Sequence, residues 1–244
     1  MTPKQDPMNI LKYIAILTSL FSAHAEAKDC VILLHGLART KGSLSKIQSA
    51  LNDAGYHTVN KGYPSTKHKI EKLAEDAITE ALSYCPTGKK VHFVTHSMGG
   101  ILVRQYLRTK TIADLGCVVM LGPPNKGSQV VDKLKNIPGF KLMNGPAGMQ
   151  LGTGKLSMPN KIGPVDFDVG IIAGTRSINL MLSTMLPNPD DGKVSVENTK
   201  LEGMTDHISL PVTHSFMMNN NEVIGQVKYF LKNRVFDLKS VKNH

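Results

Sequence analysis

The sequence predicts an α/β fold in which a mostly parallel central sheet carries helices on both faces. Short, continuous apolar runs at residues 31–34, 91–94 and 116–121 are typical of strands that are buried on both sides. Stretches with helical apolar spacing separate these runs, at residues 44–54 and 68–84. Strands that alternate with helices form βαβ units, and such units build a parallel sheet.

The remaining elements continue this alternation along the chain. Gly55 and Pro86 follow the first two helical stretches, where glycine and proline typically end a helix. In chain order we expect strands at 31–34, 56–59, 91–96, 116–121 and 168–174, and an extended segment at 208–212. Helices are expected at 44–54, at 68–84, from the end of the third strand to about residue 108, and at 221–232.

Residues 122–164 interrupt the alternation. This stretch is rich in Gly, Pro, Asn and Met and has no sustained periodicity, apart from a helix that we expect near residues 130–134. A long segment of this kind inside a compact domain is usually functional or mobile. It is interpreted as an excursion above the sheet, which forms a lid, a part of the substrate pocket, or irregular scaffolding.

The first residues have the plan of a secretory signal peptide. Residues 1–27 contain a lysine-bearing start, an apolar middle and small residues at the end, and we expect cleavage after Ala25 or Ala27. Met8 is the more natural start of such a signal. An uncleaved anchor is disfavoured, because the apolar tract falls short of the roughly 20 residues that span a membrane.

Residues 28–244 are expected to form a single domain, since a chain of 244 residues fits one α/β domain. The signal predicts an exported protein, either periplasmic or secreted, and thus an oxidising compartment. The three cysteines, Cys30, Cys85 and Cys117, fall near the same end of the predicted sheet, which favours a Cys30–Cys85 disulfide; three unpaired thiols are the alternative. None has the spacing of a metal or redox motif, and no metal site is expected.

The formal net charge is +10, which favours contact with anionic surfaces. The lysines are spread along the chain and tryptophan is absent, so we expect no nucleic-acid partner. Transient contact with a membrane or lipid surface is a further expectation. We expect the protein to be a monomer.

A candidate nucleophile lies where the strand at 91–96 turns into a helix. Ser97 follows this strand directly, which is the pattern of a nucleophile elbow. The backbone of such a serine is strained and needs small residues two positions before and after it. Gly99 meets this need, whereas Thr95 does so only partly. The alternative is an ordinary turn with an incidental serine.

A serine hydroxyl needs a base within hydrogen-bond reach and a third group that holds the base. In a fold with this elbow, an acid and then a histidine follow the serine along the chain. The polar loop at 187–192 offers Asp191, beside Gly192, with Asp190 as the alternative acid. His214 comes at the end of the last extended segment and is the candidate base.

Acyl transfer also needs donors for the oxyanion that develops on the substrate. The backbone N–H of Met98, directly after the candidate nucleophile, is the first donor. The backbone N–H of Leu37, in the loop after the first strand, is the second. His35 and Gly36 precede it, and His35 is expected to orient this loop.

Together these motifs resemble the α/β-hydrolase superfamily, and His-Ser-Met-Gly-Gly after a strand is similar to its lipase and esterase branch. The resemblance covers residues 31–230 and includes His35-Gly36-Leu37, the elbow at 95–100, Asp191-Gly192 and His214. It implies an α/β-hydrolase fold and a serine esterase that needs no metal or organic cofactor. It further implies Ser97 as nucleophile, His214 as base and Asp191 as orienting acid.

The substrate is less well defined than the candidate machinery. Apolar residues of the excursion suggest an acyl chain and favour a lipid over a small ester; they are Met143, Met149, Leu151, Leu156 and Met158. A thioesterase, amidase or acyltransferase with the same three residues is an alternative, because pocket walls choose the substrate. A lipid-binding module without catalysis is a further one.

Overall fold

The apolar runs of the sequence form a six-stranded sheet in a computed structural model, which describes residues 28–239. All neighbouring strands are parallel, in the order β2-β1-β3-β4-β5-β6, so the predicted parallel sheet is confirmed. The signal peptide predicted at 1–27 lies outside the described residues. The strands are β1 (Cys30–Leu34), β2 (His57–Val59), β3 (Val91–His96), β4 (Leu115–Leu121), β5 (Val169–Gly174) and β6 (Asp206–Leu210).

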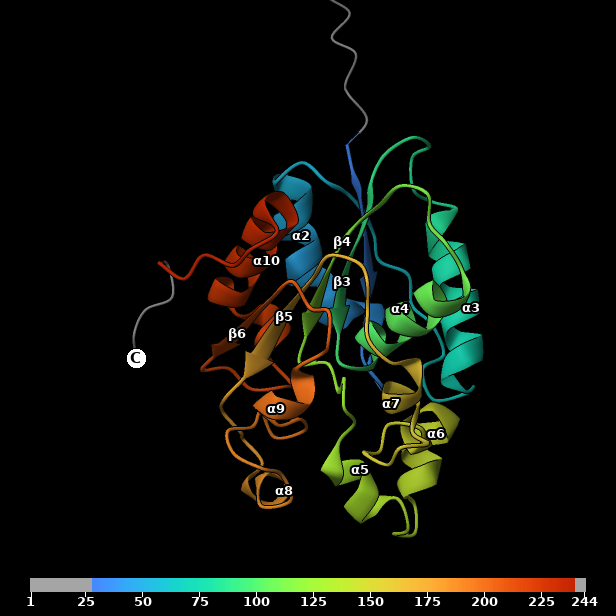
Figure 1. Cartoon of the computed structure of the whole chain (residues 1–244), viewed down its shortest axis with the longest axis vertical. Helices are drawn as coiled ribbons and strands as arrows, with labels where there is room; N and C mark the ends of the chain where they lie inside the picture. Colours follow the sequence, from blue (N-terminus) through green and yellow to red (C-terminus); the bar gives the residue numbers. More distant parts are fainter. Residues whose placement is uncertain (1–27, 240–244) are drawn as a thin grey trace, which may run out of the picture.

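Two layers of helices cover the sheet, because successive residues of a strand point to opposite faces. Ile32 and Leu34 of β1 pack into one apolar cluster, with α3 (Ile70–Leu82) and α4 (Met98–Thr109). Val31 and Leu33 pack into the other, with α2 (Ser45–Asp53) and α10 (Asn221–Asn233). Figure 1 shows the sheet between these layers. The helices predicted at these four places are therefore present.

The excursion at 122–164 is more helical than the sequence indicates. The helix expected near 130–134 is α5 (Gln129–Leu134), but α6 (Phe140–Met149) and α7 (Met158–Ile162) were not predicted. The reason is local: α6 contains Gly145, at φ 63°, followed by Pro146, so its apolar residues keep no single helical period. Two short helices after β5, α8 (Leu180–Ser183) and α9 (Val196–Thr199), also escaped prediction.

A buried arginine holds the two ends of this excursion together. Arg104 of α4 is only 2% exposed, and its guanidinium donates to the backbone oxygen and Oδ1 of Asn125, both at 3.1 Å. It also donates to the backbone oxygens of Pro159, at 2.9 Å, and Gly163, at 2.7 Å. Burial lowers its pKa to about 10, so the group is still cationic at neutral pH. The excursion is thus fixed to α4 at both ends.

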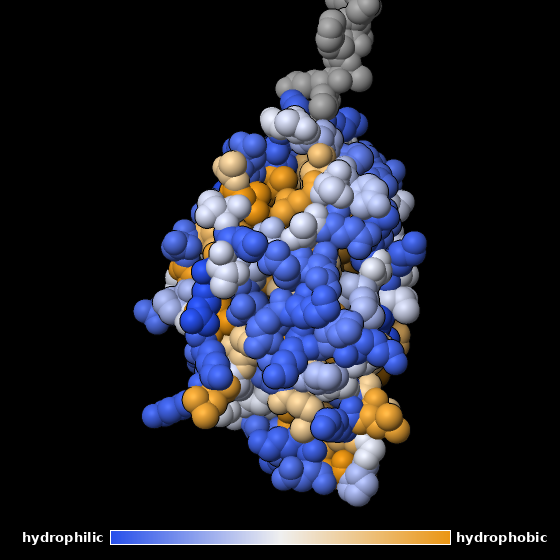
Figure 2. Space-filling view, turned by 90° about the vertical axis from the view of Figure 1, so that its right-hand side faces the viewer, coloured by the Kyte–Doolittle hydropathy of each residue, from blue (hydrophilic) through white to orange (hydrophobic). Residues whose placement is uncertain are grey.

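The helices of the excursion gather at the carboxyl ends of the strands. In Figure 1, α5 and α6 lie with α8 at the lower end of the molecule. Figure 2 shows a side that is mostly hydrophilic, with apolar side chains exposed near its upper and lower ends. Leu142 and Met143 of α6 are 89% and 74% exposed. No helix within residues 28–239 is long and apolar enough to cross a membrane.

The cysteines lie at the opposite end of the sheet. Cys30 and Cys85 form a disulfide, with 5.6 Å between their Cα atoms, which is the pairing that the sequence favours. The bridge ties the start of β1 to the chain just after α3. Cys117 is free and buried, and burial raises the pKa of its thiol to about 12. This thiol therefore stays protonated and is no nucleophile.

His92 of β3 is buried beside Cys117 and is held as a neutral ring. Its Nδ1 accepts the backbone N–H of Cys117 at 3.0 Å, which requires an unprotonated Nδ1, and its Nε2 lies 3.7 Å from Oδ2 of Asp29. Burial is the main cause that lowers the pKa of His92 to about 4; the cation Arg234 adds to this effect and Asp29 opposes it. Protonation of His92 at Nδ1 would remove the hydrogen bond from the backbone N–H of Cys117.

We expect acid to destabilise the fold through His92. Between pH 6.5 and about 4 the unfolded chain binds a proton here that the folded chain does not, so stability falls as pH falls through this window. The difference amounts to about 3 kcal/mol at the acid end. Urea unfolding of wild type and His92→Asn, whose Oδ1 takes the place of Nδ1, measures it. The variant should show the shallower dependence on pH.

His57→Asn is the matched control, because it makes the same substitution at an exposed histidine of β2. Its unfolding free energy should follow that of wild type across the window. Equal pH slopes for wild type and His92→Asn would contradict the assignment to His92.

Candidate active site

Ser97 lies at the turn between β3 and α4, in a backbone conformation that side chains rarely adopt. Its φ is 53° and its ψ is −120°, and its N–H donates to the backbone oxygen of Leu121 at 2.8 Å. A Cβ atom added at Gly99 would come within 2.5 Å of the backbone oxygen of Leu34. Only glycine fits there, and the turn therefore presents the Ser97 side chain at the carboxyl edge of the sheet.

Thr95 fits this turn because the helix supplies the missing space. The Thr95 side chain is fully buried, and its hydroxyl donates to the backbone oxygen of Val119 at 3.4 Å. A Cβ added at Gly100 would lie 3.3 Å from Thr95 Oγ1 and 3.0 Å from Met120 Sδ. The second glycine of the Gly99-Gly100 pair thus accommodates a threonine where a glycine is usual.

The structure brings Ser97, His214 and Asp191 into one chain of hydrogen bonds. Ser97 Oγ lies 3.0 Å from His214 Nε2, and His214 Nδ1 lies 2.7 Å from Asp191 Oδ2. The other carboxylate oxygen of Asp191 accepts the backbone N–H groups of Lys193 and Val194. A carboxylate only accepts, so Nδ1 of His214 carries the proton and Nε2 is free to accept the hydroxyl proton of Ser97.

Asp190, the alternative acid, has a different place. Its Oδ1 accepts the backbone N–H of Gly192 at 2.7 Å, and its Oδ2 accepts the hydroxyl of Ser183 at 2.5 Å. Asp190 therefore shapes the loop that carries Asp191. It makes no hydrogen bond with His214.

Gly122, the first residue of the excursion, makes room for this arrangement. It follows β4 directly and has a φ of 54°. A Cβ there would lie 3.0 Å from Asp191 Oδ2 and 3.1 Å from His214 Nδ1. A glycine directly after a buried strand, at the sheet edge that holds the serine, is the signal that could have identified it.

His96 positions the backbone of His214, a role that the sequence did not indicate. Its Nε2–H donates to the backbone oxygen of His214 at 3.0 Å. Complete burial, and secondly the nearby His214, hold the pKa of His96 well below its usual value, so this ring is neutral. Gly36 packs on it, since a Cβ at Gly36 would come within 2.9 Å of His96 Nδ1. The loop after β1 and the base are thus positioned by the same ring.

His35 is built into the loop after β1. Its Nδ1–H donates to the backbone oxygen of Gly36 at 2.9 Å, while Nε2 accepts the backbone N–H of Tyr63 at 3.4 Å. The two rings stack at 4.1 Å, and the Tyr63 hydroxyl donates to the backbone oxygen of His35. Burial lowers the pKa of His35, so it remains a neutral structural group.

Two backbone N–H groups near Ser97 have no hydrogen-bond acceptor in the described part of the chain: that of Leu37, which lines the cavity at Ser97, and that of Met98, the residue directly after Ser97. The next residue, Ala38, has a φ of 52°, and its N–H donates to Ser65 Oγ at 3.1 Å. This bond fixes the loop so that the Leu37 N–H is left for another acceptor. Donors of this kind suit a developing oxyanion.

Ser97 and His214 open into a cavity of about 310 Å³, and the excursion forms much of its wall. Apolar side chains of the excursion cover one side, including Val131, Phe140 and Leu151. Arg39 and Lys193 also line it, whereas no aspartate or glutamate does. The cavity therefore combines an apolar wall with two cationic side chains.

The five apolar residues predicted to contact an acyl chain line two different cavities. This corrects the prediction for those that do not line the cavity at Ser97. Met143 and Leu151 line the cavity at Ser97. Met149, Leu156 and Met158 line a separate cavity instead. The composition of the excursion does not show which way each side chain faces, and the kink at Gly145 divides α6 between them.

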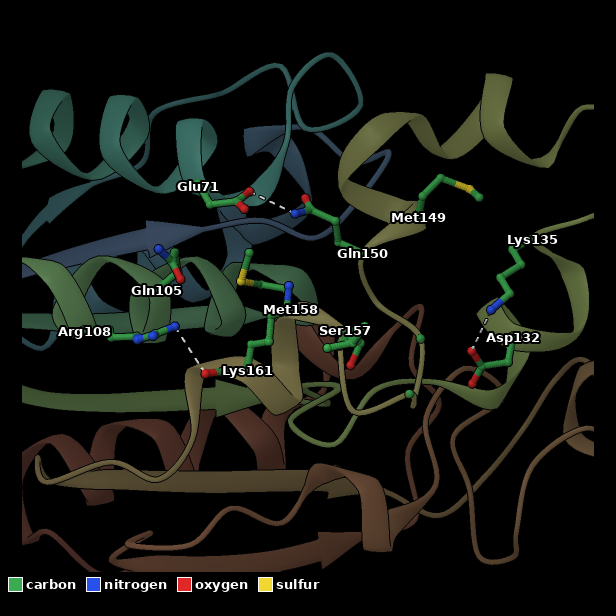
Figure 3. A pocket seen from close by; sticks show the side chains of 13 residues that line it. Glu71, Gln105, Arg108, Asp132, Lys135, Met149, Gln150, Ser157, Met158 and Lys161 are labelled. Carbon is green, nitrogen blue, oxygen red and sulfur yellow. Dashed lines mark hydrogen bonds and ion pairs between the residues drawn. The ribbon is translucent and has the colours of Figure 1, made fainter.

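The separate cavity is larger, at about 490 Å³, and is lined by none of the predicted catalytic or oxyanion residues. Figure 3 shows charged and amide side chains around it that already have partners within the protein. Gln150 donates to Glu71, Arg108 to the backbone oxygen of Lys161, and Lys135 pairs with Asp132. Size alone therefore does not identify the reactive site.

Neither a protein-family model nor a curated protein matches the sequence. Solved structures do match in fold. The mature form of lipase BlEst2 from Bacillus licheniformis aligns with a TM-score of 0.65 and 18% identity, over 84% of this chain and 93% of that one. The metagenomic carboxyl esterase MGS0156 aligns with a TM-score of 0.58 and 16% identity, over 78% and 65%.

Phospholipase PlaB from Legionella pneumophila aligns with a TM-score of 0.54 and 19% identity, over 71% of this chain but only 45% of its own length. At these identities the likeness concerns the fold. The α/β-hydrolase fold predicted from the sequence is thereby confirmed.

Proposed function

We propose that this protein is a serine hydrolase that cleaves carboxylic esters through an acyl-enzyme. The observation that carries the proposal is the chain of hydrogen bonds from Ser97 through His214 to Asp191, at a strained strand-to-helix turn. A binding protein has no need for a nucleophile, a base and an orienting acid in one line. The fold, shared with proteins described as lipases and a carboxyl esterase, supports the same function.

In the proposed mechanism Ser97 attacks the ester carbonyl while His214 takes the hydroxyl proton at Nε2. Asp191 holds the ring in the correct tautomer and stabilises the imidazolium that forms. The N–H groups of Leu37 and Met98 donate to the oxyanion. His214 then gives its proton to the departing alcohol, and a water molecule, activated by the same ring, cleaves the acyl-enzyme.

The cavity supports an ester with an apolar group of moderate length. Its volume of about 310 Å³ lies at the lower end of the range for small-molecule sites. Phe140, Val131 and Leu151 offer apolar surface to an acyl or alkyl chain. We therefore expect octanoate esters to be better substrates than palmitate esters. Export and contact with a lipid surface stay part of the proposal, and the exposed apolar residues of α6 and the disulfide support them.

The test is hydrolysis of p-nitrophenyl butyrate, octanoate and palmitate by wild type and by Ser97→Ala, together with labelling by a fluorophosphonate. Wild type should hydrolyse the shorter esters and take up the label at Ser97, and the variant should do neither. Hydrolysis of none of the three esters, with no label on Ser97, would overturn the proposal in favour of a non-catalytic binding module.

A further inference from the structure

Two cationic side chains from two different loops line the cavity that contains the candidate nucleophile. Arg39 comes directly after the His35-to-Ala38 loop, and Lys193 comes two residues after Asp191. Both line the cavity that contains Ser97 and His214, at its solvent-accessible side. The two loops that position the oxyanion donors and the orienting acid therefore each place one positive charge at the same cavity.

Neither cation has an ion-pair partner in the described part of the chain. In residues 28–239, the side chains of Arg39 and Lys193 form no ion pair or hydrogen bond, and no carboxylate lines the cavity. Desolvation, and next the charge of Arg39, lower the pKa of the Lys193 ammonium, whereas Asp191 raises it. The two cations thus repel each other beside an apolar wall. An anion between them would remove this repulsion.

We propose that Arg39 and Lys193 form an anion-binding subsite, so that the preferred substrate is an ester that also carries a phosphate or carboxylate group. The inference rests on the proposed ester hydrolase function and specifies its substrate class. The apolar part of the substrate lies along the wall at Val131, Phe140 and Leu151, and the anionic group lies against the two cations. A guanidinium and an ammonium are the donors that suit phosphate and carboxylate oxygens.

Two pairs of esters test the subsite, each matched except for its charge. The first pair is p-nitrophenyl valerate and mono-p-nitrophenyl glutarate, which differ in a carboxylate on the acyl side. The second is monooctanoylglycerol and its glycerol phosphate counterpart, which differ in a phosphate on the alcohol side. For wild type, the ratio of kcat/KM for the charged to the neutral ester should exceed one in at least one pair, and the pair concerned identifies the source of the anion.

Arg39→Gln and Lys193→Gln should each lower that ratio about tenfold, since each removes one charged hydrogen-bond donor. Lys141→Gln is the matched control, because it removes a charge next to Phe140 on α6 from a side chain that does not line the cavity. Added salt should lower the wild-type ratio and have less effect on the double variant. A ratio unchanged in the double variant, or lowered equally in Lys141→Gln, would overturn the subsite.

A binding measurement separates this failure from failure of the proposed function. Octyl phosphate is titrated calorimetrically into Ser97→Ala, and into the same protein with Arg39→Gln and Lys193→Gln added. Binding that weakens at least tenfold on loss of the cations supports the subsite, whether or not wild type hydrolyses an ester. Equal binding by the two proteins, or binding by neither, rejects it.

Discussion

Replacement of Asp191 by asparagine is expected to lower kcat for an ester substrate about 10⁴-fold, the loss typical of an orienting acid of this kind. The contacts of Asp191 define the reason. Its Oδ1 accepts two backbone N–H groups, so the asparagine oxygen would stay there and its NH₂ group would face His214 Nδ1. Nδ1 would then have to accept, the ring proton would move to Nε2, and Nε2 could no longer take the proton of Ser97.

Asp190→Asn is the control, since it removes the same charge one residue earlier. Asp190 contacts Gly192 and Ser183 but not His214, so kcat should stay within about tenfold of wild type. Stopped-flow or steady-state hydrolysis of p-nitrophenyl octanoate measures both variants. Similar losses for Asp190→Asn and Asp191→Asn would show that the loop, and not the contact with His214, is what matters.

Reduction of the Cys30–Cys85 disulfide is expected to lower the free energy of unfolding by about 4 kcal/mol, because the bridge closes a long loop in the unfolded chain. The two cysteines are separated by 55 residues, which include β2 and α3. Urea unfolding of the oxidised and reduced wild-type protein measures the difference without any change in side-chain packing.

Cys85→Ala provides the matching variant and leaves the fully buried Cys30 side chain in the core. Its stability should equal that of the reduced wild type and should not respond to reductant. If oxidised and reduced wild type unfold with free energies within about 1 kcal/mol of each other, the loop-closure account is wrong.

The strands and the hydrogen-bonded arrangement of Ser97, His214 and Asp191 could be predicted because their signals are local. A buried parallel strand is a continuous apolar run, as at Val31 to Leu34, and the site residues of a parallel sheet lie where strands end. Ser97, Asp191 and His214 each follow a strand or its loop in a required order. The choice of Asp191 over Asp190 had less support. The conformation of the turn decides which of the two carboxylates contacts the imidazole, and Gly192 is the only sign of that turn in the sequence.

The residues that surround Ser97, His214 and Asp191 could not be predicted, because their roles depend on contacts between distant segments. A residue without a Cβ atom is needed at position 122 only because the side chains of Asp191 and His214 meet next to it. His96 belongs to β3, and only its contact with the His214 backbone gives it a supporting role. Arg39 and Lys193 become a pair only when two loops far apart in the sequence share one cavity. Composition could not reveal any of these contacts.

The guanidinium of Arg104 has a consequence for how the pocket can be altered. It binds Asn125 near one end of the excursion and Pro159 and Gly163 near the other. The intervening segment is therefore fixed at both ends, and Ser128 Oγ also ties it to the loop of Asp191, through the backbone oxygen of Lys193 at 2.7 Å. Substitutions within residues 129–157 would change the wall of the pocket while the contacts of Arg104 stay in place. The wall of the pocket can thus be altered within one segment that lies apart from the sheet at whose edge Ser97 stands.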